Sequence, residues 1–188
     1  MTQPTPHVLA AAQHLAGLTH YWAHESIAPD TTEWRVSGVI FSALVMIDGG
    51  SQVEPFQLAP GRAGDTSLAP ALAQAFAAHF PDHPGIQAFR SGPERSGFGP
   101  QDAPATAAQA AAHLIERLRG SYAFFLHADL SLHERLVGAA YALTALLAGQ
   151  VTGEPRWTLL PPDAEAPALN LNAYELHDLW SRPPGGRA

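Results

Sequence analysis

Two long apolar stretches dominate the hydrophobic pattern of the chain, Val36–Ile47 and Leu136–Ala148. The first suits a strand or a helix, because it is rich in β-branched residues and ends in Asp-Gly-Gly, a common hairpin signal. The second is rich in alanine and leucine, which favours a helix. If the two share a fold, both are helices that end at Gly49 and Gly149. Apolar residues on nearly every face predict that both are buried.

The two stretches are in register at an offset of 100 residues. Between 35–60 and 135–160 five positions are identical: an arginine, two glycines, a glutamate and a proline. They are Arg35/Arg135, Gly38/Gly138, Gly49/Gly149, Glu54/Glu154 and Pro55/Pro155. The first glycine pair permits close backbone approach, so the two helices are candidates to pack against each other there. We therefore predict an internal duplication.

The predicted unit is a helix, a central helix, a short strand and a helix. The first unit spans 7–82 and the second 103–182, and both share one core. A Gly- and Pro-rich linker, 83–102, joins them, and 183–188 form a disordered tail. The predicted fold class is α+β, mainly α, with the two units packed as a pseudo-two-fold domain.

Short β-like runs follow both central helices, at 55–60 and 155–161. Because the units are predicted to be related by a pseudo-two-fold axis, we expect these strands to pair with each other. The segment Ile86–Arg90 is a candidate third strand.

Capping signals mark the predicted helix starts. Asp30-Thr31-Thr32-Glu33 offers a capping box, and Asp129 with Ser131 and Glu134 offers a similar arrangement for the second central helix. Thr106 is the expected N-cap of the first helix of the second unit. Asp65-Thr66 is the expected N-cap of the last helix of the first unit.

Composition restricts the function. In 188 residues, 46% are hydrophobic and 14% charged, which provides ample material for a core. The absence of cysteine excludes disulfides, cysteine-ligated metals and thiol catalysis. All ten basic residues are arginines, so Schiff-base chemistry and a Walker-type phosphate loop are excluded too. The net charge of −7 disfavours nucleic acid as a partner.

The expected location is cytoplasmic, without a membrane partner. The N-terminal apolar run has no basic residue before it, which argues against a signal peptide. The longest apolar runs are shorter than the ~20 residues that span a bilayer.

The chain is histidine-rich, with ten histidines, and this raises the question of metal binding. His20 and His24 lie one helical turn apart on one face, a spacing that suits two ligands of zinc or another divalent metal. Candidates for a third ligand are Glu25, His127, Asp129 and His133. The pattern is not HExxH. The alternative is that these are ordinary surface or partly buried histidines.

Asp48 breaks the duplication, because its counterpart is Ala148. It either accepts hydrogen bonds from the amides that follow it, in an Asx-type turn, or serves as a binding carboxylate beside Arg35 and Trp34. Arg35 in turn is expected to clamp Glu54, as Arg135 would clamp Glu154. If that pair does not form, the free arginine is an anion site.

The stretch RxxGxxFSxLVxIDGGS resembles uncharacterised small bacterial proteins with an F-S-x-L-V-x-(I/L)-D-G motif. Those proteins continue with a short strand and a later L-H-(E/D) helix. The corresponding pieces here are Phe41–Ser51, Phe56–Pro60 and Leu176-His177-Asp178. The resemblance covers about one unit and implies no activity.

These observations favour a non-enzymatic module that binds a protein partner or a small molecule in the groove between the units, without a cofactor. A homodimer is the candidate assembly. The alternative is a metal-dependent hydrolase built on the histidines.

Overall fold

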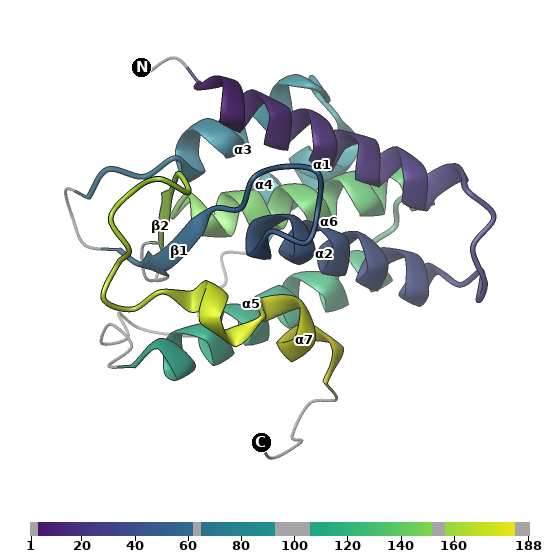
Figure 1. Ribbon diagram of the computed structural model, residues 1–188. Helices are drawn as coiled ribbons and strands as arrows, with labels where there is room; N and C mark the ends of the chain where they lie inside the picture. The colour runs from purple at the N-terminus through teal and green to yellow at the C-terminus, as the bar shows by residue number, and fades with distance from the viewer. Residues whose placement is uncertain (1–3, 62–64, 93–105, 152–156, 183–188) are drawn as a thin grey trace.

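The computed structural model describes residues 4–61, 65–92, 106–151 and 157–182. Within these ranges it contains seven α-helices, one short 3₁₀ helix and a two-stranded antiparallel sheet (Figure 1). The prediction of an α+β, mainly α fold is therefore confirmed. In chain order the elements are α1 (Pro6–His24), α2 (Thr32–Asp48), β1 (Gln57–Pro60), α3 (Ala69–Ala78), α4 (Pro84–Ser91), α5 (Ala107–His127), α6 (Leu132–Leu147), β2 (Trp157–Leu160), η1 (Leu171–Tyr174) and α7 (Leu176–Ser181).

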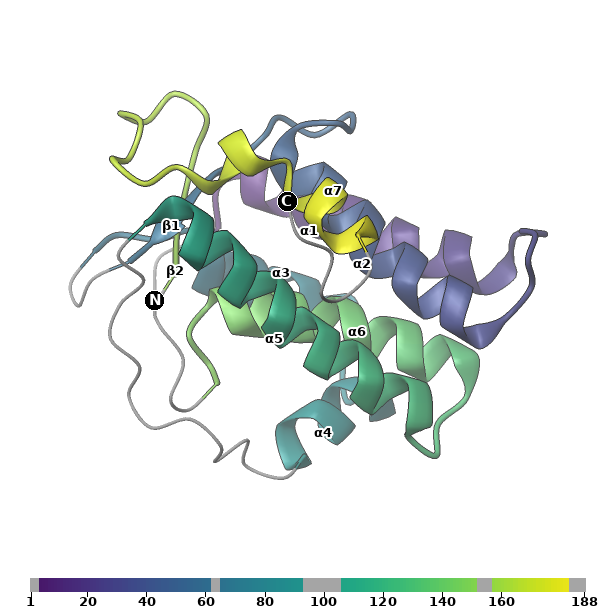
Figure 2. The same cartoon turned by 90° about the horizontal axis from the view of Figure 1, so that it is seen from below.

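Helix α6 forms the centre of the molecule. Every residue from 136 to 147 is buried, and α1 to α5 all pack against this helix (Figures 1 and 2). The predicted burial is thus confirmed for α6. Helix α2 leaves Phe41, Ser42 and Val45 only partly buried. None of the helices in the described ranges has the length and apolar character needed to cross a membrane.

The two strands pair as the sequence predicts. Gln57 lies opposite Leu160, and Pro60 lies opposite Trp157. At the offset of 100, Gln57 corresponds to Trp157 and Pro60 corresponds to Leu160. Replacing each residue of one pair by its counterpart therefore gives the other pair, and the register is the same when the two strands are exchanged. This is the pairing expected across a pseudo-two-fold axis.

The expected third strand is wrong, because Ile86–Arg90 lie in helix α4. Pro84 is the first helical residue, and His83 caps the helix by accepting a hydrogen bond from the Gly85 amide. At Gly85 the backbone approaches that of α6 so closely that an added Cβ would overlap Glu134 and Gly138. Helix α4 thus occupies part of the segment predicted as a linker; 93–105 and the predicted tail lie outside the described residues.

The two halves match through their first three elements and then differ. Both run helix, helix, strand, but α3 and α4 follow β1, whereas η1 and the short α7 follow β2. The duplication itself stays a prediction.

Gly38 and Gly138 both allow a neighbouring group to approach the helix backbone closely. The neighbours are not each other, so the predicted packing of α2 on α6 at these glycines is wrong. Gly38 lies against the indole of Trp22 in α1, and Gly138 lies against the ring of Phe125 in α5 and the backbone of Gly85. Each glycine therefore accommodates an aromatic ring of the preceding helix in its own half.

Most of the predicted caps are present. The Thr31 and Thr106 hydroxyls accept hydrogen bonds from backbone amides of α2 and α5, and Ser131 and Glu134 form a reciprocal capping box on α6. At the start of α2 the described contacts contain only the Thr31 cap, without the reciprocal bond of the expected box. The cap expected at Asp65-Thr66 is wrong: α3 begins at Ala69 and has no side-chain cap.

Candidate functional site

Arg35 is a structural clamp. Its side chain is buried, and its Nε donates to Asp30 Oδ1 at 2.7 Å. The two remaining nitrogens donate to the backbone carbonyls of Trp22 and Glu25, where α1 ends. The predicted pair with Glu54 is therefore wrong, and no free guanidinium remains to bind an anion.

Arg135 repeats this role in the second half. It donates to the carbonyls of Leu126 and Leu130, at the end of α5 and in the turn that leads to α6. Its predicted partner Glu154 lies outside the described residues. In both halves the arginine closes the turn between two consecutive helices.

The three residues predicted to bind a ligand do not form one site. Arg35 lies in the first turn of α2 and Asp48 at its last residue, about 20 Å apart along the axis. Trp34 is 46% exposed on the surface of the first turn.

Asp48 instead binds His177, which lies in α7. Asp48 Oδ2 is 2.7 Å from His177 Nδ1, and it also accepts the His177 backbone N–H at 3.2 Å. The expected Asx turn is absent from the described contacts, because the amides of Gly49 and Gly50 donate to carbonyls of α2. Burial raises the pKa of Asp48, and the hydrogen bonds from His177 oppose that shift.

The pair brings together two pieces of the motif described above. Asp48 and Phe41 belong to the F-S-x-L-V-x-I-D-G stretch, and His177 belongs to the L-H-D stretch. The Phe41 ring also contacts the His177 ring edge-on, with centroids 5.7 Å apart. The sequence analysis missed this contact, although the two motif pieces were the signal that could have found it.

A carboxylate bonded to a histidine is also the arrangement that orients a general base. Among the described residues, however, no Ser or Thr hydroxyl is hydrogen-bonded to the His177 ring. Its Nε2 faces Asp178 Oδ1 at 3.7 Å. The geometry supports a structural hydrogen bond that holds α7 against α2, rather than a pair that activates a nucleophile.

Three of the four predicted metal ligands come together. His20 and His24, both exposed near the end of α1, lie beside His133 at the start of α6. The ring centroid of His133 is 5.3 Å from that of His20 and 6.1 Å from that of His24. His127 belongs to none of the ring contacts seen in the described ranges. For His127 the metal-ligand role stays a prediction.

His83, which no motif had marked, adds a fourth imidazole. Its ring centroid lies 5.2 Å from that of His133 in a T-shaped contact, and Phe80 packs beside both rings. Burial and the neighbouring imidazoles, His83 foremost, hold the pKa of His133 below its ordinary value. Burial likewise lowers the pKa of His83. As placed, no group of three or more His, Asp or Glu side chains within the described part of the chain is arranged to hold a metal ion.

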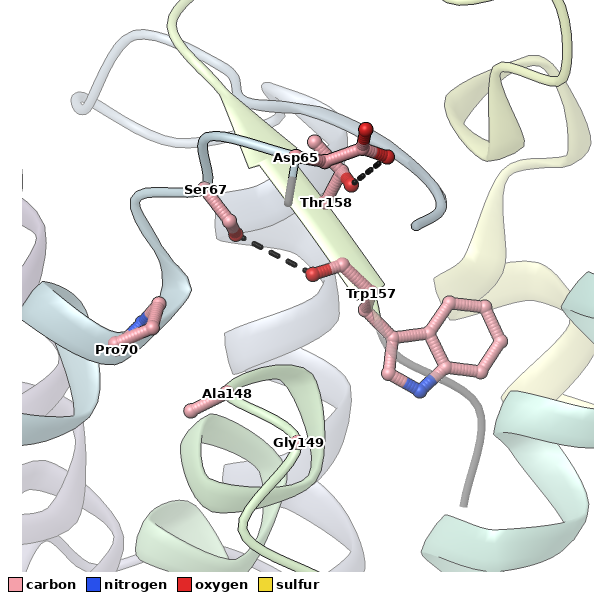
Figure 3. Close-up of a pocket in the computed structure, with 7 residues that line it drawn as sticks. All are labelled: Asp65, Ser67, Pro70, Ala148, Gly149, Trp157 and Thr158. Atoms are coloured by element: carbon pink, nitrogen blue, oxygen red, sulfur yellow. Dashed lines mark hydrogen bonds between the residues drawn. The ribbon is translucent and has the colours of Figure 1, made fainter. Parts of the chain in front are cut away.

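A polar pocket of about 270 Å³ lies between the two halves (Figure 3). The segment before α3 contributes one wall, and β2 with the end of α6 contributes the other. Its lining residues are Asp65, Ser67, Pro70, Ala148, Gly149, Trp157 and Thr158.

Hydrogen bonds across the pocket hold the two walls in place. The Ser67 hydroxyl donates to the Trp157 carbonyl at 3.3 Å and accepts the Leu159 amide at 3.0 Å. The Thr158 hydroxyl donates to Asp65 Oδ2 at 3.4 Å. The sequence patterns did not bring these residues together as one site, because their common position depends on how the segment before α3 packs against β2 and the end of α6.

Comparison with known proteins adds no name to this arrangement. No protein-family model matches the chain, and neither a curated protein nor a solved structure matches it. The sites are therefore interpreted from their own geometry.

Proposed function

We propose that the protein is a non-enzymatic binding module that takes a small polar molecule, a donor of hydrogen bonds, in the pocket between its two halves. The observation that carries the proposal is the composition of the pocket wall. Both halves contribute oxygen atoms to it, from the Asp65 carboxylate, the hydroxyls of Ser67 and Thr158 and the carbonyl of Trp157.

The electrostatics of the wall favour the same ligand class. Ala148 and Gly149 lie at the C-terminal end of α6, where the helix dipole places partial negative charge. The Asp65 carboxylate adds a formal negative charge. An amine or a polyol would meet these acceptors with N–H or O–H donors.

The volume restricts the size of the ligand. Pockets for drug-sized molecules usually span ~300–1,000 Å³, so about 270 Å³ suits a smaller compound. A protein partner would need a larger surface. We therefore favour the small-molecule version of the sequence prediction; the homodimer stays a prediction.

Trp157 supplies the experimental readout. The residue lines the pocket, its indole is buried and points away from Ser67 and Pro70 (Figure 3), and its Nε1 has no hydrogen-bond partner among the described residues. In a ¹⁵N-labelled sample, the indole N–H signals of the four tryptophans can be followed while primary amines and polyols are titrated. A true ligand shifts the Trp157 signal, which is assigned with Trp157→Phe.

Two variants decide whether the bound compound uses the pocket. Thr158→Val keeps the side-chain shape but removes one hydroxyl, and should weaken binding roughly five- to tenfold, the effect of about one hydrogen bond. Ser181→Ala, an exposed change in α7, is the matched control and should leave affinity unchanged. If no amine or polyol shifts Trp157, or if both variants bind as the wild type does, the proposal is wrong.

A metal-dependent hydrolase remains the alternative. The proximity of the His20, His24 and His133 rings favours a metal at the other end of α6.

A further inference from the structure

We propose that His20, His24 and His133 bind a divalent transition metal of the zinc type, with His83 beside the open position of the site. The three imidazoles come from two helices, and the nearest ligands, His24 at the end of α1 and His133 in the first turn of α6, are 109 residues apart in the chain. The site lies at the opposite end of α6 from the polar pocket, about 24 Å away along the helix, and does not depend on it.

The spacing of the rings fits a shared metal. Zinc binds histidine nitrogen at about 2.0–2.1 Å in tetrahedral sites, which places neighbouring ring centres about 5 Å apart. The observed separations are 5.3 Å for His20–His133, 6.0 Å for His20–His24 and 6.1 Å for His24–His133. Small side-chain adjustments therefore suffice to bring the three rings around one ion.

The present ring orientations explain why the donor atoms do not yet converge. His20 stacks on His24 at 19° and on His133 at 28°, so the rings present faces to one another instead of nitrogen atoms. The terminal torsion of histidine has broad minima, and His20 and His24 are exposed. Rotation of these two rings needs no rearrangement of the core.

His133 supplies the strongest local indication of a ligand. Its Nε2 is buried and has no hydrogen-bond partner among the described residues. A buried nitrogen without a partner is costly, and a metal ion would satisfy it.

His83 has a different role, because its tautomer is set by the cap of α4. Its Nδ1 accepts a hydrogen bond from the Gly85 amide at 3.3 Å, so in the neutral ring the proton is on Nε2. A protonated Nε2 cannot coordinate a metal, but it can donate to a water or anion on that metal. The three-histidine set with one open position is typical of sites that bind an exchangeable ligand.

The kind of metal ion follows from the chemistry of the ligands. A site made of imidazoles suits zinc, copper, nickel or cobalt and disfavours calcium and magnesium, which prefer oxygen. Zinc is the probe for affinity, and cobalt is the probe for geometry because its visible absorption reports the coordination number.

The test uses the untagged full-length protein after dialysis against a chelator. Zinc titration by calorimetry should give one site per chain, and cobalt should give the intense visible bands of a four-coordinate ion. His20→Ala, His24→Ala and His133→Asn should each weaken zinc at least a hundredfold. His79→Ala and His127→Ala remove exposed histidines outside the site and serve as matched controls with unchanged affinity.

Two further observations keep the result decisive. His24 is exposed, so His24→Ala should fold as the wild type does even if His133→Asn does not, and circular dichroism checks this. His83→Asn should retain zinc within about tenfold. The proposal is overturned if the wild type binds zinc no more tightly than the His20→Ala/His24→Ala double variant, or if the control variants lose as much affinity as the ligand variants.

Discussion

Asp48 Oδ2 lies 2.7 Å from His177 Nδ1, although 129 residues separate the two in the chain. The carboxylate stands at the C-terminal end of α2, where the helix dipole disfavours negative charge. It is compensated by the His177 ring and by the backbone N–H of the same residue in α7. The contact with His177 thus explains why an acidic residue stands at the end of α2. Ala148, the residue at the corresponding position of α6, has no such role.

Asp48→Asn should change the pH dependence of stability. Burial raises the pKa of Asp48 in the folded state, so folding favours the protonated carboxyl. This contribution is fully present below the unfolded-state pKa of about 3.9 and is lost as pH rises through the folded-state value. The wild type should therefore lose stability relative to Asp48→Asn as pH rises from about 3 to 5.5, a range below the ordinary titration of histidine.

Urea unfolding of both proteins across this range measures the effect. Asp178→Asn, whose carboxylate is 53% exposed, is the control and should give a flat difference from the wild type. A wild type that gains stability over Asp48→Asn with rising pH would show that the His177 contact outweighs burial.

Local patterns predicted the parts of the fold that depend on neighbouring residues. The two apolar stretches gave the helix ends at Gly49 and Gly149 and the deep burial of α6, and the runs near 57 and 157 gave the strand pair. The helix ends and the burial follow from residue type and spacing along one segment, whereas the strand pairing was predicted from the match between the two halves.

Contacts between distant segments were not predictable in this way. Residues 86–90 look like a short strand, but the close fit of Gly85 against Gly138 holds them as a helix on α6. His83 joined the histidine cluster because it caps that helix, a position that no motif marks. Likewise nothing in the local pattern pairs Asp48 with His177.

Gly38→Ala should destabilise the protein by about 1–3 kcal/mol, the usual effect of overpacking a tight contact. The added methyl would overlap the indole of Trp22, whose Nε1 is also held by the Ser42 hydroxyl. Gly17→Ala is the control, because an added Cβ there meets no described atom within 4 Å. Alanine should stabilise that exposed helical position by up to about 1 kcal/mol. Urea unfolding measures both variants. If Gly38→Ala raises the free energy of unfolding as much as Gly17→Ala does, the indole of Trp22 moves aside without a measurable cost.

Arg35→Gln should lower the free energy of unfolding by at least about 2 kcal/mol, because it leaves the carbonyls of Trp22 and Glu25 without their charged donor. Asp30→Asn removes only the ion pair. The Asp30 side chain is 76% exposed, so this change should cost less than about 1 kcal/mol. Thermal or urea unfolding of the two variants separates the roles. Similar losses in both would mean that the ion pair, rather than the carbonyl clamp, closes the turn between α1 and α2.

Asn172 completes the edge of the small sheet, and its replacement tests how the C-terminal segment is held. Its Oδ1 accepts the Leu58 amide at 2.9 Å, and its Nδ2 donates to the carbonyls of Ile47 at 3.0 Å and Phe56 at 2.8 Å. Asn172→Ala should cost about 2–3 kcal/mol and expose the Leu58 amide to hydrogen exchange. Asn172→Asp should cost at least as much at neutral pH, because a carboxylate would face two carbonyl oxygens.

Asn170→Ala is the control. It removes a single capping bond and should cost about 1 kcal/mol with the Leu58 amide still protected from exchange. If Leu58 stays protected in Asn172→Ala, the side chain is not what closes this edge, and the link between β1 and η1 must rest on apolar packing alone.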